Sequence, residues 1–204
     1  MTPARGDHEA RRSEVSEGVW RVLSTRGFEG LTLRAVAAEL GASTGLLTHY
    51  FPNKKALLSH ALEELDRRSG ARPRRTAPAD GSAPPPAGMA RLRAALLDVL
   101  PLDEPARAGN RIWVGSWDVA LADPDLAAAH AGRYGRSREA ITAHLAEARR
   151  LGEVPGECDP VELAAAAQAF VLGLVVQALF APAEFPAERQ IALVDGFLAG
   201  IASA

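Results

Sequence analysis

The first 68 residues show apolar stripes with helical spacing, separated by residues that end helices. Over 12–26 the apolar residues recur every three or four positions, which predicts an amphipathic helix. These residues are Val15, Val19, Val22 and Leu23. Residues 33–40 repeat the pattern behind Thr32, a good N-cap, and Gly41 ends this second helix.

A shorter helix follows, and packing on a core explains its apolar residues but not its polar ones. Ser43 can cap its start, and Pro52 ends it because the residue before a proline avoids the α region. Leu47 and Phe51 lie four residues apart and give the helix one inward face. A further helix is predicted over 54–68. Two short helices joined by a tight turn and supported by a preceding helix have the layout of a helix-turn-helix.

Beyond residue 68 the pattern changes twice. Residues 69–88 are rich in Pro, Gly, Ala and Arg, which predicts a flexible, partly polyproline linker. Helical spacing then returns and predicts six helices, over 89–100, 107–122, 124–131, 132–151, 160–181 and 186–202. No alternating β-branched run is evident, so we predict an all-α protein. It has a three-helix helix-turn-helix domain at 1–68, the linker at 69–88, and a helical domain at 89–204.

Charge is unevenly distributed along the chain. Residues 1–75 contain 13 Lys and Arg against 9 Asp and Glu, a net charge of +4, whereas residues 76–204 have a net charge of −6. A basic first part joined to an acidic remainder suits a nucleic-acid-binding head on a body with another role. The alternative is chance scatter of charge over a solvated surface.

Motifs for catalysis, metals and membranes are missing from the sequence. There is no Gly-rich phosphate loop after a strand, no nucleophile motif, and no metal-ligand spacing among the five histidines. Cys158 is the single cysteine, which excludes an intrachain disulfide and a cysteine-based metal site. The run 164–181 is the only membrane candidate, but Gln168 and Gln177 favour a core or interface helix. The first 19 residues lack the apolar core of a signal peptide. We therefore expect a cytoplasmic protein that is no enzyme and has no cofactor.

The polar residues of the short helix suit contact with DNA. Small donors and acceptors that can reach base edges or phosphates lie at Ser43, Thr44 and Thr48. Gly45 permits close approach of the backbone. Lysines follow at 54 and 55, at a helix start whose amides and dipole already favour an anion. Each residue alone also has a structural explanation as a cap, a boundary residue or a solvated turn.

The stretch "TLRAVAAELGASTGLLTHYFPNKKALL" resembles the DNA-binding signature of TetR-family transcriptional regulators, and "STGLLTHYF" is similar to the BetI-like branch. The valine familiar after the turn glycine is Ala42 here. The resemblance implies that Thr32 caps its helix and touches phosphate, and that Arg34 reaches a base or phosphate. It further implies a DNA-facing surface made by Ser43, Thr44, Gly45 and Thr48. Contacts to the DNA backbone are implied for His49, Tyr50 and Lys54. Members of this family bind palindromic operators as homodimers, usually as repressors.

The remainder resembles a BetI-type C-terminal domain, beginning with "RIWVGSWDVALADPDLAAAH". The resemblance implies that the helices near 160–181 and 186–202 form a four-helix interface with a partner subunit. A ligand pocket between helices of the acidic body is expected, with these candidates: Trp113, Trp117, Tyr134, Phe170, Leu174 and Gln177. Two tryptophans with acidic neighbours can hold a cation, but aromatic residues more often fill cores, and that interpretation is favoured.

The sequence thus predicts a DNA-binding regulator, a repressor released from its palindromic operator by a small-molecule effector. Two alternatives stay open. One is a DNA-binding repressor that senses no small molecule. The other is a helical small-molecule-binding protein or enzyme with a vestigial DNA-binding head.

Overall fold

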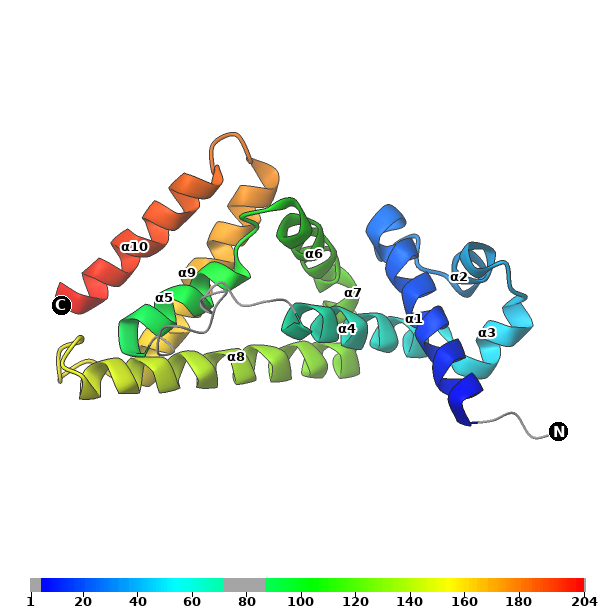
Figure 1. The fold of residues 1–204 in the computed structure, drawn as a ribbon, viewed down its shortest axis with the longest axis horizontal. Coiled ribbons are helices and arrows are strands. Elements are labelled where there is room, and N and C mark those ends of the chain that lie inside the picture. The colour runs from blue at the N-terminus through cyan, green and yellow to red at the C-terminus, as the bar shows by residue number, and fades with distance from the viewer. Residues whose placement is uncertain (1–4, 72–86, 204) are drawn as a thin grey trace. The chain divides into compact units, whose positions relative to one another are not determined.

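The computed structural model describes residues 5–71 and 87–203, and the side chains of 11–68 and 87–203 within them. Over these residues the chain forms ten α-helices and no strand (Figure 1), which confirms the all-α class expected from the sequence. Most of the predicted linker at 69–88 lies outside the described residues, but its first three residues are helical, since α4 continues to Ala71 and α5 begins at Gly88.

The chain divides into two compact units. We call them the head unit, Met1–Arg72 with Ile112–Leu126, and the body unit, Pro73–Arg111 with Ala127–Ala204. The sequence boundaries assigned all of 89–204 to one domain, whereas 112–126 makes its contacts in the head unit. Ile112, Ala120 and Leu126 lie in the same hydrophobic cluster as the first four helices. Their apolar spacing alone gave no sign of which unit they would join.

The head unit is built on a long first helix. This helix, α1 (Arg5–Arg26), packs against α2 (Leu33–Leu40) and α4 (Lys54–Ala71), and α2 packs against the short α3 (Thr44–Tyr50). The short α7 (Trp117–Leu121) completes the unit. Fully buried leucines fill the centre of this core: Leu23, Leu31, Leu47, Leu57, Leu62 and Leu65.

Two glycines of the head unit occupy positions that a larger residue would disturb. A Cβ at Gly18 would lie 2.8 Å from Cγ of Leu40, so a side chain there would push α1 and α2 apart. Gly41 has φ of +61°, the left-handed conformation in which α2 ends. The turn between α2 and α3 therefore depends on a residue without a Cβ.

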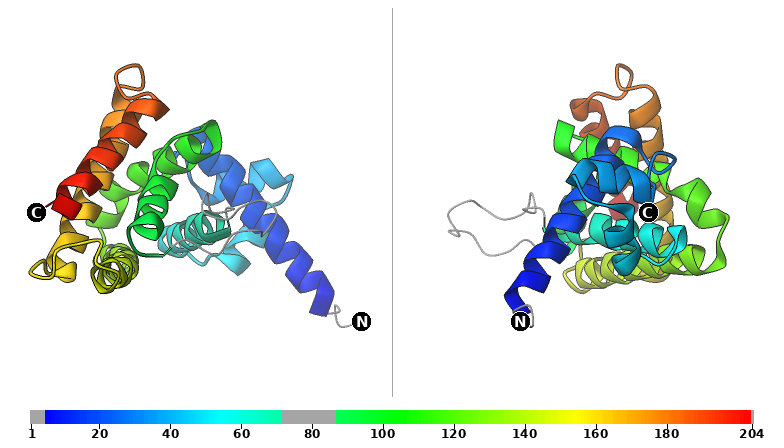
Figure 2. Two further views of the ribbon diagram at one scale, coloured as in Figure 1. Left: turned by 60° about the vertical axis from the view of Figure 1, so that its left-hand side comes forward. Right: turned by 90° about the vertical axis from the view of Figure 1, so that its right-hand side faces the viewer.

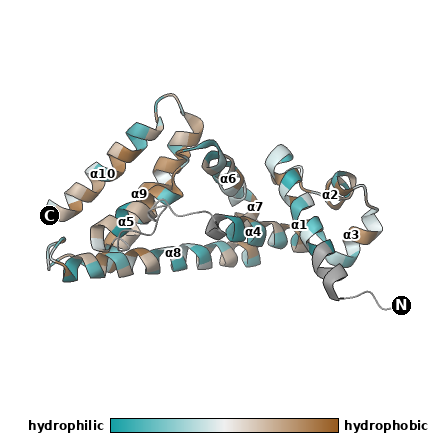
Figure 3. Cartoon of the chain, viewed as in Figure 1, coloured by the Kyte–Doolittle hydropathy of each residue, from teal (hydrophilic) through white to brown (hydrophobic). Residues whose placement is uncertain are grey.

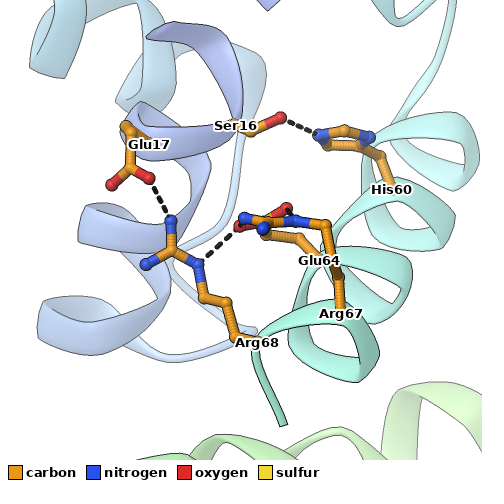
Figure 4. A network of polar contacts seen from close by, with 6 residues as sticks. All are labelled: Ser16, Glu17, His60, Glu64, Arg67 and Arg68. Atoms are coloured by element: carbon orange, nitrogen blue, oxygen red, sulfur yellow. Dashed lines mark hydrogen bonds and ion pairs between the residues drawn. The ribbon is translucent and has the colours of Figure 1, made fainter. Parts of the chain in front are cut away.

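A network of ion pairs on α4 reaches α1 through Arg68 (Figure 4). Glu64 is only 4% exposed and accepts hydrogen bonds from Arg67 and Arg68, and Arg68 also pairs with Glu17 of α1. Arg68 lies over the Trp20 ring, 4.5 Å from its centroid. Burial alone raises the pKa of Glu64, but the two guanidinium groups outweigh it and the net pKa is lowered. Glu64 thus binds Arg68 within α4, and the pair between Arg68 and Glu17 joins this helix to α1.

The body unit is a bundle whose closest helices are α5 (Gly88–Val99), α9 (Pro160–Phe180) and α10 (Ala187–Ser203). The views in Figure 2 show α9 and α10 as two long helices joined at one end by a short loop. The remaining helices are α6 (Glu104–Gly115) and α8 (Pro124–Arg150), each of which has residues in both units.

Two predicted helix boundaries were wrong. The helix expected over 107–122 is two helices, α6 and α7, separated at the buried Ser116, whose hydroxyl donates to the Trp113 carbonyl at 2.6 Å. The helices expected over 124–131 and 132–151 are one continuous helix, α8. A helical glycine costs about 1 kcal/mol relative to alanine. The cost of Gly132 and Gly135 is therefore too small to interrupt a helix that buries apolar residues on both sides of them.

Helix α9 is apolar nearly all round (Figure 3). Its length and composition are those of a membrane-spanning helix, but the core helix of a soluble protein meets the same two criteria. Within its most apolar 18-residue window, 39% of the residues are buried. Its buried Gln168 is satisfied within the body unit, because it accepts from Arg138 at 2.8 Å and donates to the Tyr134 carbonyl at 3.0 Å. Paired burial of this amide fits a helix packed inside protein.

Candidate nucleic-acid interface

Helix α3 has one buried face and one polar face. Leu47 is fully buried and Phe51, just after the helix, is 6% exposed, as the sequence predicted. Ser43 caps the helix, since its Oγ accepts from the Leu46 amide at 3.3 Å. The exposed side, which we call the polar face of α3, consists of Ser43, Thr44, Gly45, Thr48 and His49.

The polar face keeps hydrogen-bonding capacity for a partner. Thr48 Oγ1 donates to the Gly45 carbonyl at 2.8 Å, which leaves its lone pairs free to accept. A Cβ at Gly45 would meet only Ser43 Oγ, at 3.8 Å, so no contact inside the protein requires glycine there. Glycine near a helix start lowers helix stability. Its use is therefore better explained by close approach of another molecule.

The two residues predicted on α2 lie at its start. Thr32 is the N-cap, and its Oγ1 accepts from the Ala35 amide at 3.0 Å. Arg34 is exposed in the first turn. Both are accessible, and the cap on Thr32 is established independently of any role with phosphate.

The two lysines that begin α4 have different surroundings. Lys55 Nζ lies 3.0 Å from Asp123 Oδ2 and 2.5 Å from Asp125 Oδ2. Hydrogen bonds to Asp125 and Asp123 raise the pKa of Lys55. Lys54 is exposed and has no ion-pair partner in the described part of the chain. Of the pair, only Lys54 keeps its charge available for a phosphate.

A pocket of about 300 Å³ lies at the end of α3 and was not foreseen from the sequence. We call it the α3-end pocket, and its lining residues are Arg12, Val15, His49, Tyr50, Phe51 and His60. Sequence analysis expected DNA contacts from His49 and Tyr50 but not from Arg12 or His60. Those two come from α1 and α4, and no motif spacing links them to α3.

His60 is the most constrained polar group in this pocket. Its Nε2 lies 3.0 Å from Ser16 Oγ of α1 (Figure 4), and its ring is tilted against Phe51 with centroids 5.1 Å apart. Burial lowers the pKa of His60, and the charge of Arg12 acts in the same direction, against Glu63 and Glu64. The ring is therefore held in its neutral form at physiological pH.

The six residues predicted for a ligand pocket come from both units. Trp113 packs against the hydrophobic cluster of the head unit, and Trp117 belongs to the same unit. In the body unit Leu174 is buried, Gln177 is exposed, and Phe170 stacks on Phe197 at 4.5 Å. Tyr134 lies next to the His130 ring, with centroids 6.1 Å apart. The pocket remains a prediction.

Helices α9 and α10 each expose a set of small residues. These are Ala165, Ala166, Ala169 and Gly173 on α9, and Ala192, Gly196, Ala199 and Gly200 on α10. A Cβ at Gly173, Gly196 or Gly200 would meet nothing within 4 Å. Phe180, at the end of α9, is 81% exposed. We call the eight Ala and Gly residues named above the small-residue face.

Comparison with known proteins identifies the family. The family model for bacterial regulatory proteins of the tetR family matches residues 15–61, and that for the BetI-type transcriptional repressor C-terminal domain matches 88–203. The HTH-type transcriptional regulator PksA of Bacillus subtilis is 30% identical over 188 residues, or 92% of this chain and 87% of the relative. This chain belongs to the TetR family.

Another curated relative and two solved structures are also similar to this chain. The HTH-type transcriptional regulator BetI of Burkholderia mallei is 29% identical over 124 residues, covering 61% of this chain and 62% of the relative. A transcriptional regulator from Rhodococcus sp. has a TM-score of 0.75 at 26% identity, over 94% of this chain and 95% of that one. One from Saccharomonospora viridis, in complex with choline, has a TM-score of 0.80 at 23% identity, over 94% and 96% of the chains.

The resemblance seen in the sequence is therefore confirmed at both ends of the chain. The protein is a helix-turn-helix transcriptional regulator of the TetR family with a body of the BetI repressor type. Proteins of this family are regulators of transcription, not enzymes.

Proposed function

We propose that this TetR-family protein is a repressor that binds a palindromic operator through the polar face of α3 and leaves it when a small molecule binds. The polar face supports this proposal most directly, because no contact in the structure requires a glycine at Gly45 and Lys54 has no acidic partner among the described residues. In the proposal Ser43, Thr44 and Thr48 contact base edges. Thr32, Arg34, Tyr50 and Lys54 contact the backbone.

Operator binding is tested by finding the DNA that the protein selects. Random duplexes retained by the purified protein are sequenced, with a Thr48→Ala/Tyr50→Ala/Lys54→Ala variant treated in parallel. A palindromic motif retained by the unaltered protein and absent from the variant supports the proposal. A motif shared by both proteins would mean that these three side chains do not make the contact, and no motif in either points to a helical small-molecule-binding protein with a vestigial head.

A homodimer supplies the two heads that a palindrome needs. The small-residue face supports this part of the proposal, because Gly and Ala on α9 and α10 allow two helix pairs to approach closely. Exposed Phe180 and Val161 add apolar surface that a partner would cover. A palindromic site with half-sites one helical turn apart, or a multiple of it, matches a two-fold dimer.

Release by a small molecule is the second half of the proposal. The indole Nε1 of Trp117 is buried and has no hydrogen-bond partner among the described residues, so it is a donor that a ligand can satisfy. Choline is the first compound to test, since the Saccharomonospora viridis regulator was crystallised with it. An effector that prefers the DNA-free conformation shifts the protein away from the operator.

A repressor without an effector is the second candidate. The packing of Trp113 against the head core favours it, because that tryptophan then serves structure instead of a ligand. Operator affinity measured with and without choline and a panel of small cations and acids separates the two candidates. A loss of affinity with any compound supports release, and constant affinity across the panel supports the second candidate. In both cases we place the protein in the cytoplasm, where it meets DNA.

A further inference from the structure

The α3-end pocket offers positive or donor groups around an apolar floor. Val15 and Phe51 are 3% and 6% exposed and form the floor. Arg12 and His49 are exposed, and Tyr50 and His60 are half-buried. No carboxylate lines the pocket. The chemistry suits an anion attached to an apolar group, because guanidinium and phenol donate to the anion while the floor packs on carbon.

Arg12 differs from its neighbour on α1 in its ion pairing among the described residues. Its neighbour Arg11 pairs with Glu14 at 2.8 Å. Arg12 has no ion-pair partner in the part of the chain that the structure describes, although its charge is close enough to influence His60. An exposed guanidinium without an ion pair among the described residues can donate to an anion from outside the protein.

The position of the pocket selects the anion. His49 belongs to the polar face of α3 and Tyr50 ends the same helix, so a group in the pocket lies where α3 meets its DNA. Arg12 extends that surface onto α1. A DNA backbone unit has the required two-part chemistry, since its phosphate is anionic and its deoxyribose presents carbon. A volume of about 300 Å³ is at the small end of ligand sites and suits one such unit.

We propose that the α3-end pocket seats one sugar-phosphate unit of the operator backbone, with Arg12 donating to the phosphate and the sugar packed on Val15 and Phe51. This rests on the proposed operator binding and adds α1 to the DNA-contacting elements. Each protomer then neutralises one more phosphate than α2, α3 and Lys54 provide. The contact is independent of sequence, so it raises affinity for every duplex alike.

The test compares two adjacent arginines on α1. Operator affinity is measured between about 50 and 200 mM salt for the unaltered protein, Arg12→Gln, and the matched control Arg11→Gln. One lost phosphate contact reduces the slope of log affinity against log salt by about 0.9 per bound protomer. We expect this reduction for Arg12→Gln, with an unchanged ratio of operator to scrambled-duplex affinity, and a much smaller one for Arg11→Gln. Arg12→Lys should restore the slope.

Equal slopes for Arg12→Gln and Arg11→Gln would overturn the proposal. Both residues are exposed, so neither variant should unfold, and thermal denaturation verifies this. Titration with inorganic phosphate at constant ionic strength, without DNA, tests whether the pocket binds a free phosphate ion instead of a DNA phosphate. Micromolar phosphate binding that Arg12→Gln abolishes, together with equal slopes, would assign the pocket to a free anion. If the unaltered protein binds no operator, the proposed function fails first, and that result is distinct from either outcome above.

Discussion

Two adjacent lysines show how much a single residue depends on its surroundings. In the sequence Lys54 and Lys55 are equivalent, since both begin a helix where a positive charge opposes the dipole. In the structure Lys55 is paired with Asp123 and Asp125, from the turn before α8 and its first residues, whereas Lys54 faces solvent. No local pattern could predict this, because the two aspartates lie far along the chain.

We expect Lys54→Ala to weaken operator binding and Lys55→Ala to affect it much less. Loss of a phosphate contact at Lys54 should lower the slope of log affinity against log salt by about 0.9 per protomer. Lys55 is already neutralised by two carboxylates, so its removal releases no DNA counterion. Fluorescence anisotropy titrations at several salt concentrations measure both slopes, and a larger change for Lys55→Ala would refute the distinction.

His60 should make stability depend on pH. Burial lowers the pKa of this imidazole in the folded protein, so below about pH 6.5 the unfolded chain takes up the proton first. The free energy of unfolding should therefore fall as the pH is lowered from 7 to 5. Urea denaturation of His60→Gln should show a flatter profile over this range, whereas the exposed His49→Gln should keep the slope. Parallel profiles for the unaltered protein and His60→Gln would contradict this.

At the scale of the element, helix ends were predictable where a capping side chain or a breaker marks them. The limits of α2 and α3 lie within a residue of those expected from Thr32, Ser43 and Pro52. Asp159 caps α9 ahead of Pro160 in the same way. The interruption at Ser116 and the continuity through Gly132 depend on tertiary burial, which a linear pattern does not contain.

The start of α5 depends on a glycine. Gly88 has φ of +52°, and a Cβ there would lie 2.0 Å from Oε2 of Glu153, the carboxylate that accepts from the Met89 amide. Gly88→Ala should therefore lower the free energy of unfolding by more than about 1 kcal/mol. Gly135→Ala is the matched control inside α8, where a Cβ meets nothing within 4 Å, and it should raise the same quantity by about 0.5–1 kcal/mol. Urea denaturation measures both, and stabilisation by Gly88→Ala would contradict the geometry.

At the scale of the whole molecule, the DNA-binding helices follow from local sequence, whereas the α3-end pocket does not. Arg12 and His60 meet His49 and Tyr50 only because α1, α3 and α4 fold around one core. The ligand-pocket candidates have the same difficulty, because apolar and aromatic residues fill cores and cavities alike. Sequence therefore predicts the class of the protein better than its individual contacts.

The small-residue face should be where two copies of the chain meet. Gly196→Glu places a charged side chain on this face of α10, where a Cβ fits the monomer without contact. We expect sedimentation velocity to show monomers and operator affinity to fall. Ala146→Glu, on an exposed position of α8 outside the face, should leave the dimer intact. A dimer that persists in Gly196→Glu would place the interface elsewhere.

The central claim is that the polar face of α3, with Tyr50 and Lys54, binds operator DNA. It is tested most directly by the affinity of the selected operator for the unaltered protein and the Thr48→Ala/Tyr50→Ala/Lys54→Ala variant, measured by fluorescence anisotropy at one salt concentration. Loss of three contacts that are each worth about 1 kcal/mol or more predicts a fall in affinity of at least about a hundredfold. The variant should stay folded, because Leu47 and Phe51, which hold α3 on the core, are unchanged. Equal affinity of the folded variant and the unaltered protein would contradict the claim.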